Sequence, residues 1–191
     1  MLRNVAIAAF LVSLVPFAAF AQVNLHSNAE RRDAAIFEDI TKQVTGYTRF
    51  TVFDDIQASV TQGVVTLYGK VTMPFKREDI ARRVANVAGV TEVVNKISVL
   101  PVSQFDQELR YKIARAIYGN PSFWHYASMV NPPIHIIVEN GHVTLTGVVN
   151  NEVEKMQARS LASGFDAFSV TSELKTDAEA RAELEKVEKG G

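Results

Sequence analysis

Histidines and paired carboxylates are the residues of this 191-residue chain that could do chemistry. The histidines are His26, His125, His135 and His142. None of them has the His-x-x-x-His spacing that points two imidazoles at one metal ion. Paired carboxylates such as Glu38 and Asp39 are neighbours in the sequence, so they cannot face each other across a cleft. We therefore expect no catalytic residues, no bound metal and no cofactor.

The chain has no cysteine, which excludes a thiolate metal site, a cysteine nucleophile and disulfide bonds. A Gly-x-Ser-x-Gly nucleophile motif and a phosphate-binding glycine loop are also absent from the sequence. The composition, 47% hydrophobic and 21% charged with a net charge of −1, is that of a globular protein. Because wide contact with phosphates needs many clustered Lys and Arg side chains, nucleic acid is not an expected partner.

Aromatic and basic residues between positions 110 and 126 could instead bind a membrane surface. Tyr and Trp favour the headgroup region because one end of the side chain is apolar and the other forms hydrogen bonds. An arginine can hold a lipid phosphate with two parallel hydrogen bonds. Arg110 and Lys112 add positive charge to the same segment. The predicted lipid-binding residues are Tyr111, Arg115, Tyr118, Phe123, Trp124 (the only tryptophan) and Tyr126.

Other interpretations stay open for these side chains. Phe123 and Trp124 could cap the core of their own domain or line a seam between domains, because large aromatic side chains are usually mostly buried. Helix phase points Tyr111 and Tyr118 outward, toward either lipid or protein. A rival basic patch, diluted by neighbouring carboxylates, comprises Lys76, Arg77, Arg82 and Arg83.

The first residues have the pattern of a secretory signal. Arg3 precedes an apolar run, and Ala19-Phe20-Ala21 supplies the small residues that signal peptidase needs. We predict a signal peptide over residues 1–21 with cleavage after Ala21; the alternative is an uncleaved membrane anchor. No cysteine follows the cleavage point, so the mature chain is expected in the periplasm or secreted, and not as a lipoprotein. His26 is expected in an unstructured N-terminus.

The rest of the chain repeats itself. "VTQGVVTLYGKV" (60–71) and "VENGHVTLTGVV" (138–149) agree at seven of twelve positions with a shift of 78 residues. Both have the alternation of a β-hairpin around a turn, and Asn-Gly is a strong turn signal. A segment of helical periodicity precedes each hairpin, a second follows it, and a strand ends each copy.

The predicted fold class is α+β, with two tandem αββαβ sandwiches that each pack two helices on a three-stranded sheet. We place the domains at residues 31–100 and 104–176, followed by a charged tail at 177–191 that forms a solvated helix. The expected inward side chains of the first helices are Ile36, Phe37, Ile40 and Val44, and Phe105, Leu109, Ile113 and Ile117. Those of the second helix of copy two are Val153, Met156, Leu161 and Ala162, behind an N-cap at Asn151 with Glu154 as its reciprocal partner.

These elements resemble the BON domain of bacterial envelope proteins, with a V-x-L-x-G-x-V strand, an Ala-rich helix and a final G-V-x-x-V-x-N strand. Copy one matches at Val65, Leu67, Gly69, Val71, Gly89, Val90, Val93, Asn95, Ile97 and Val99. Copy two matches at Val143, Leu145, Gly147, Val149, Ala158, Leu161, Ala162, Val170 and Leu174. The tandem arrangement is similar to osmotically induced periplasmic members and dual-domain outer-membrane members. The resemblance implies a non-enzymatic protein of envelope integrity, and in some members the second domain binds anionic phospholipid.

The two copies differ where the aromatic residues lie. The loop after the first helix is five residues longer in copy two, and it contains "PSFWHY". The leading hypothesis is therefore an exported protein whose second domain binds the surface of anionic phospholipid membranes. The alternative is an adaptor or stress-protective protein that docks an envelope protein and does not touch lipid.

Overall fold

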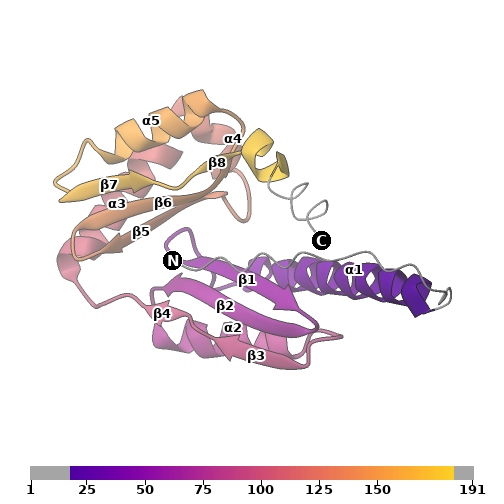
Figure 1. Ribbon diagram of the computed structural model, residues 1–191. Helices are drawn as coiled ribbons and strands as arrows, with labels where there is room; N and C mark the ends of the chain where they lie inside the picture. The colour runs from indigo at the N-terminus through magenta and orange to yellow at the C-terminus, as the bar shows by residue number, and fades with distance from the viewer. Residues whose placement is uncertain (1–17, 183–191) are drawn as a thin grey trace, which may run out of the picture.

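A computed structural model describes residues 18–182, with side chains from residue 28 onward. Two similar halves follow each other along the chain (Figure 1). The first half contains α1 (Ala18–Thr45), β1 (Asp55–Thr61), β2 (Val64–Val71), α2 (Pro74–Ala85), β3 (Glu92–Asn95) and β4 (Ser98–Val99). The second contains α3 (Gln104–Tyr118), the 3₁₀ turn η1 (Pro121–Phe123), α4 (Trp124–Ala127), β5 (Ile134–Glu139), β6 (His142–Val149), α5 (Glu152–Ala162), β7 (Ser169–Ser172) and β8 (Lys175–Thr176).

Each half has one sheet with the longest strand in its centre. In the first half β2 pairs with β1 in antiparallel fashion and with β3 and β4 in parallel fashion. The second half repeats this arrangement around β6. Because β3 and β4 lie along the same side of β2, each sheet is three strands wide and its last strand is interrupted. The predicted α+β fold with tandem helix-covered sheets is confirmed.

Each half buries its own apolar core between the helices and one face of the sheet. The core positions predicted from helix periodicity are mostly buried, but the prediction was wrong for Phe37, Phe105, Val153 and Met156, which are exposed. In α5 the small side chains of Ala158 and Ala162 face the core instead. Val153 and Met156 are left at the surface, while Leu161 packs partly buried against the core.

The repeated glycine of the V-x-L-x-G motif is required by a close backbone approach. Gly69 has φ +115° and Gly147 has φ +112°. A Cβ atom would lie 2.1 Å from the Asp55 carbonyl oxygen at Gly69, and 1.8 Å from that of Pro133 at Gly147. No side chain fits at such distances, so both copies keep glycine where β2 and β6 pass the start of the preceding strand.

In both halves an aspartate on the first helix also binds the hairpin turn. The carboxylate of Asp33 on α1 accepts hydrogen bonds from the N–H groups of Gln62 and Gly63, 2.7 and 3.0 Å long. In the second half Asp106 on α3 does the same for the Asn140-Gly141 turn, with bonds of 2.9 and 2.7 Å. Each first helix is thereby fixed to the hairpin beneath it.

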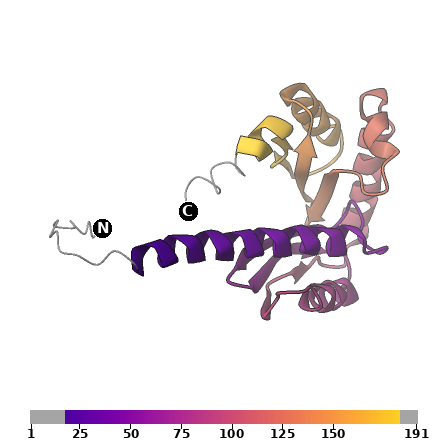
Figure 2. The same ribbon diagram turned by 90° about the vertical axis from the view of Figure 1, so that its right-hand side faces the viewer.

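The N-terminal helix differs from expectation, whereas the C-terminal tail begins as the exposed helix that the sequence predicts. The helix α1 begins at Ala18 and passes through His26, so the segment expected to be unstructured is helical (Figure 2). The signal-peptide prediction lies largely outside the described residues. At the other end, Thr176 and Glu179 form reciprocal bonds: the Glu179 N–H donates to the Thr176 hydroxyl, and the Thr176 N–H to the Glu179 carboxylate. This capping box starts the tail helix, which the structure describes as far as residue 182.

A seam of direct contacts joins the two halves. The loop between α1 and β1 lies against β5 and the segment before it, and residues of this seam line a groove of about 390 Å³ and a smaller cavity of about 220 Å³. The aromatic contacts are Phe50 with His135 and Phe53 with Tyr111. The polar contacts are a 2.7 Å hydrogen bond from the Ile136 N–H to the Val52 carbonyl, a 2.8 Å bond from the Asn131 amide to the Thr45 carbonyl, and an ion pair between Lys70 and Glu139.

A mostly buried histidine lies in this seam. The His135 ring packs against Phe50 with 5.4 Å between ring centroids, and its Nδ1 has no hydrogen-bond partner among the described residues. Burial lowers the pKa of His135 below its ordinary 6.5, and the nearby carboxylates of Asp55 and Asp54 oppose this only in part. The folded chain therefore keeps His135 neutral where the unfolded chain already binds a proton.

This histidine should make the chain less stable in acid. A lowered folded pKa means that stability contributed by neutral His135 is present above pH ~6.5 and is lost as pH falls through the folded pKa. His135→Gln places there the residue that the first half has at the equivalent position, Gln57. We expect the loss of Tm between pH 8 and pH 5 to be smaller for this variant than for the unsubstituted chain. Equal losses in thermal unfolding would show that folding does not lower the pKa of His135.

Candidate functional site

The helix α3 presents two of the predicted membrane-binding residues to solvent. The helix starts at Ser103, whose hydroxyl accepts a 3.2 Å bond from the Asp106 N–H. Tyr111 is 56% exposed, and its ring packs edge-to-face with the Phe53 ring, with 5.3 Å between the ring centroids. Arg115, one turn further on, is exposed and has no ion-pair partner within residues 18–182. This guanidinium is free to meet an anion.

Two other residues of α3 do not lie where the sequence placed them. Tyr118 is partly buried against the core, and its hydroxyl donates to the Ile134 carbonyl, so it does not present an open tyrosine face. Burial raises the pKa of Tyr118 well above its usual range. Arg110 is buried and donates a 2.5 Å bond to the Val138 carbonyl, and burial lowers its pKa. Arg110 therefore adds no charge to the surface.

The loop after α3, which is five residues longer than its counterpart in the first half, separates its aromatic side chains. This insertion loop forms η1 and α4, a compact turn rather than an open loop. Phe123 is fully buried in the core of the second half, and Tyr126 is 4% exposed. Trp124 is 65% exposed. The interpretation as a core cap is therefore correct for Phe123 and the surface interpretation for Trp124, and the buried rings of Phe123 and Tyr126 cannot reach a membrane in this fold.

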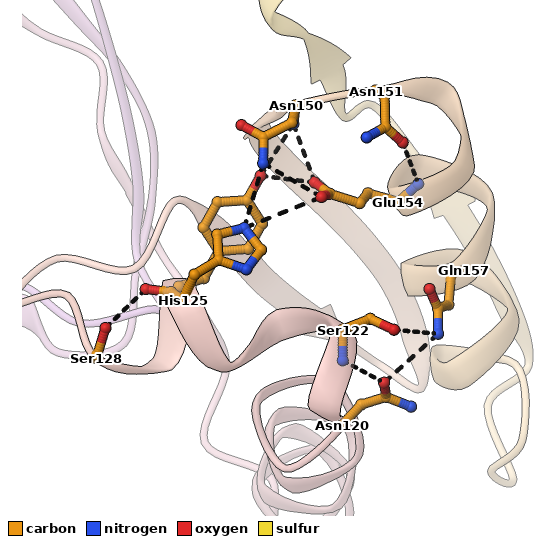
Figure 3. A network of polar contacts seen from close by, with 9 residues as sticks. Asn120, Ser122, His125, Ser128, Asn150, Asn151, Glu154 and Gln157 are labelled. Atoms are coloured by element: carbon orange, nitrogen blue, oxygen red, sulfur yellow. Dashed lines mark hydrogen bonds and ion pairs between the residues drawn. The ribbon is translucent and has the colours of Figure 1, made fainter.

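Polar contacts bind the insertion to α5 (Figure 3). The Tyr126 hydroxyl donates a 2.7 Å bond to the Glu154 carboxylate and accepts one of 2.9 Å from the Asn150 N–H. At the other end, the Gln157 amide donates to the Ser122 hydroxyl at 3.1 Å. These bonds hold the turn that carries Trp124 in one orientation.

The cap of α5 explains part of this network. The Asn151 side chain accepts a 3.0 Å bond from the Glu154 N–H, as the sequence predicts. The Glu154 carboxylate, however, accepts from the N–H of Asn150 rather than that of Asn151, because the Tyr126 hydroxyl also lies at that point. Burial tends to raise the pKa of Glu154, but the bonds from Tyr126 and Asn150 outweigh it and lower that pKa. The carboxylate is thus kept charged within the network.

The rival basic patch of the first half is engaged internally. Lys76 is buried and pairs with Asp54, while Arg77 pairs with Glu78. The other two side chains are also engaged: Arg82 pairs with Asp79 and Arg83 lies over the Tyr47 ring. We therefore do not place an anion-binding surface on α2.

Two surface residues were missed by the sequence analysis. Val153 and Met156 are exposed on α5, one position before Glu154 and Gln157, the two residues that bind the insertion. They stand three residues apart and share one side of α5. The signal was present in the sequence, because Ala158 and Ala162 also fit a core-facing row, but periodicity alone did not choose between them.

Within the described part of the chain, no cluster of three or more His, Asp or Glu side chains could hold a metal ion. None of the helices between residues 18 and 182 is long and apolar enough to cross a bilayer. The exposed side chains of α3, α4 and α5 include Tyr111, Arg115, Trp124, Val153 and Met156. We refer to these five residues as the aromatic face.

The fold defines a class of protein with two helix-covered sheets in tandem. Residues 32–101 and 106–178 both match the model of the BON domain, so the chain belongs to the BON-domain family and carries two such domains. We call them the first and the second BON domain.

Osmotically-inducible protein Y of Escherichia coli (strain K12) is 30% identical to this chain over 125 residues. The match covers 64% of this chain and 62% of that relative, less than two thirds of its length. Two solved structures of CdsD, a structural protein of the type III secretion system of Chlamydia trachomatis, align at 12% identity with TM-scores of 0.27 and 0.25. The alignments cover 79% and 72% of this chain and 97% and 94% of those chains.

Proposed function

We propose that this chain is a non-enzymatic, exported protein of the bacterial envelope that binds anionic phospholipid surfaces through its second BON domain. The observation that carries the proposal is Trp124, which is 65% exposed on a turn held rigid by the bonds to α5. A large amphipathic side chain that a rigid turn holds at the surface suits the headgroup region of a bilayer. The similarity to an osmotically inducible protein supports a role in osmotic stress and envelope integrity.

Charge supports the same surface. Arg115 lies on the solvent side of α3 without an ion-pair partner in the described chain, and Lys112 is exposed on the same helix. Each basic side chain at an anionic leaflet contributes ~1 kcal/mol, and salt screens this attraction. Val153 and Met156 add exposed apolar area on α5, the helix that binds the turn of Trp124. Binding through so few residues should be reversible and weaken as ionic strength rises.

A second function rests on a different contact. Tyr111 packs edge-to-face on Phe53, which belongs to the first domain, so part of the aromatic face already serves protein contact at the seam. A protein adaptor of the envelope would use the face in this way and would not depend on lipid charge. Headgroup preference and salt dependence separate the two functions.

The test is co-sedimentation with liposomes of phosphatidylglycerol and phosphatidylcholine against phosphatidylcholine alone. The chain is expressed from its full sequence and purified from periplasmic extract. We expect binding to the anionic vesicles only, and the Tyr111→Ala/Trp124→Ala variant should bind at least about tenfold more weakly, which corresponds to ~1.4 kcal/mol. Circular dichroism verifies that the variant is folded.

The matched control is Phe168→Ala. Phe168 is 74% exposed on the same domain but lies at its hairpin turn, where its ring packs near Phe105 and His142. This variant should bind as tightly as the unsubstituted chain. Equal loss in both variants would place the lipid contact elsewhere, and no binding to anionic vesicles would leave the adaptor function.

A further inference from the structure

The equivalent edge strands of the two domains, β1 and β5, differ in the hydrogen-bond partners of their outward backbone groups. In the second domain β5 is the edge strand, and the backbone groups of Ile134, Ile136 and Val138 point away from β6. Each of these residues has a partner at that edge. The Tyr118 hydroxyl donates a hydrogen bond to the Ile134 carbonyl, and the Arg110 guanidinium donates one to the Val138 carbonyl. The Ile136 N–H donates to the Val52 carbonyl.

The equivalent edge of β1 has no such partners. Ile56, Ala58 and Val60 occupy the matching positions, since the pairing register of β1 with β2 repeats that of β5 with β6. Among residues 18–182, no hydrogen bond outside the strand ladder involves the backbone groups of these three residues. An unpaired edge of this kind is a template for another strand.

The reason lies in the helix above each edge. Phe37 and Thr45 of α1 stand where Arg110 and Tyr118 stand in α3. A phenylalanine has nothing to donate, and the Thr45 hydroxyl donates to the Thr41 carbonyl of its own helix at 2.8 Å. The first domain therefore lacks the two side chains that close the edge in the second.

We propose that the edge of β1 binds an extended segment of a partner protein, which adds a strand beside β1 and under α1. The second domain supplies the precedent within this molecule. There a backbone carbonyl, that of Val52, approaches from a separate segment and accepts the 2.7 Å bond from the Ile136 N–H. The Ala58 N–H is the equivalent donor in the first domain, and strand addition would satisfy it in the same way.

The position of α1 decides what can dock. Figure 1 shows β1 as an outer strand of its sheet, next to α1, while α2 packs on β2, β3 and β4. Packed helices lie ~8–10 Å apart and strands ~4.8 Å apart, so α1 overhangs the outer edge of β1. A second copy that paired its own β1 with this edge would bring a second α1 into the same space. A single extended segment brings no helix and fits.

The chemistry of the groove sets the pattern of the segment. Phe37 and Thr45 occupy the positions from which Arg110 and Tyr118 reach the edge of β5. With Thr41 between them they form an uncharged, exposed row of α1 at the edge of β1. A fitting segment therefore has small or apolar side chains at alternate positions facing α1, and polar side chains toward solvent. The sequence of β1 itself, DIQASVT, has this pattern and contains no proline. A peptide of that sequence can pair with β1 in antiparallel register, with its alanine opposite Ala58.

The experiment titrates the purified full chain with the acetylated and amidated peptide DIQASVT, followed by NMR. We expect shift changes confined to β1 and α1 at about 1 mM peptide, and at least about tenfold slower hydrogen exchange of the Ala58 amide. A peptide N-methylated at its alanine, which cannot donate there, is the matched control and should not bind. Ala58→Pro removes the outward N–H without touching the bonds to β2, and should also abolish binding.

Three results overturn the proposal. One is the absence of shift changes at that concentration, and another is equal binding of the N-methylated peptide. The third is an Ala58 amide that exchanges as slowly as the Ile136 amide in the unliganded chain, since that edge would then already be closed. The N-methylated peptide keeps the test decisive if Ala58→Pro does not fold.

Discussion

Asp54→Ala is expected to destabilise the first BON domain by ~3–5 kcal/mol, because it leaves the charge of Lys76 buried without its partner. Asp54 is fully buried, and Lys76 Nζ lies 2.6 Å from its carboxylate. The carboxylate also accepts four bonds from the N–H and hydroxyl groups of Thr51 and Thr72, between 2.7 and 2.9 Å long.

Urea unfolding followed by circular dichroism measures this loss. Because the only tryptophan, Trp124, lies in the second domain, its fluorescence reports that domain separately. The double variant Asp54→Ala/Lys76→Met removes both charges and should lose less stability than Asp54→Ala alone. The neighbouring Asp55→Ala, at a half-buried position, should cost less than ~1 kcal/mol. Matching midpoints for Asp54→Ala and the unsubstituted chain would contradict the assigned role.

The network around Asp54 shows how the two copies reached one geometry with different residues. In the first domain Asp54 accepts the Thr72 N–H at the end of β2, and Lys76 neutralises the carboxylate. In the second domain the carboxylate comes from Glu154, at the position equivalent to Lys76, and accepts the Asn150 N–H. The Tyr126 hydroxyl then supplies the donor. The insertion thus replaces an ion pair by a tyrosine and positions Trp124 in the same step.

The sequence was sufficient for the fold because the signals there are local and repeated. Alternation around Gln62-Gly63 and Asn140-Gly141 predicts the hairpins, and positive φ at both positions of each turn confirms the turn chemistry. The glycine of each V-x-L-x-G motif is explained by one close backbone contact. A pattern that appears twice also gives two chances to identify it.

The surface was harder to predict, because its residues are set by tertiary partners. Helix phase alone predicts that Tyr118 points outward from α3. In the structure its hydroxyl lies inward, because it donates to the Ile134 carbonyl at the edge of β5. Arg110 is buried for the same reason, since Val138 offers it a carbonyl. No periodicity distinguishes Phe123 from Trp124 in a short turn. Which of the two rings is buried depends on the hydrogen bonds between this turn and α5, and these tertiary contacts cannot be read from the sequence.

That distinction leads to the second large effect. Phe123→Ala should destabilise the second BON domain by ~3–5 kcal/mol, because the ring is fully buried and its removal leaves a cavity in the core. Trp124→Ala, one residue later, removes a larger but exposed side chain and should change stability by no more than ~0.5 kcal/mol. The two variants are a matched pair, adjacent in sequence and opposite in burial.

Chemical unfolding followed by circular dichroism measures the difference in stability between the two variants, because Trp124→Ala removes the only tryptophan and with it the tryptophan fluorescence. A stable Trp124→Ala variant also makes its liposome result interpretable, since lost binding then reflects the missing side chain and not lost structure. The contrary outcome, a large loss for Trp124→Ala with little for Phe123→Ala, would mean that the turn packs the other way round. In that case Phe123 would be the exposed ring, and the aromatic face would have to be built around it.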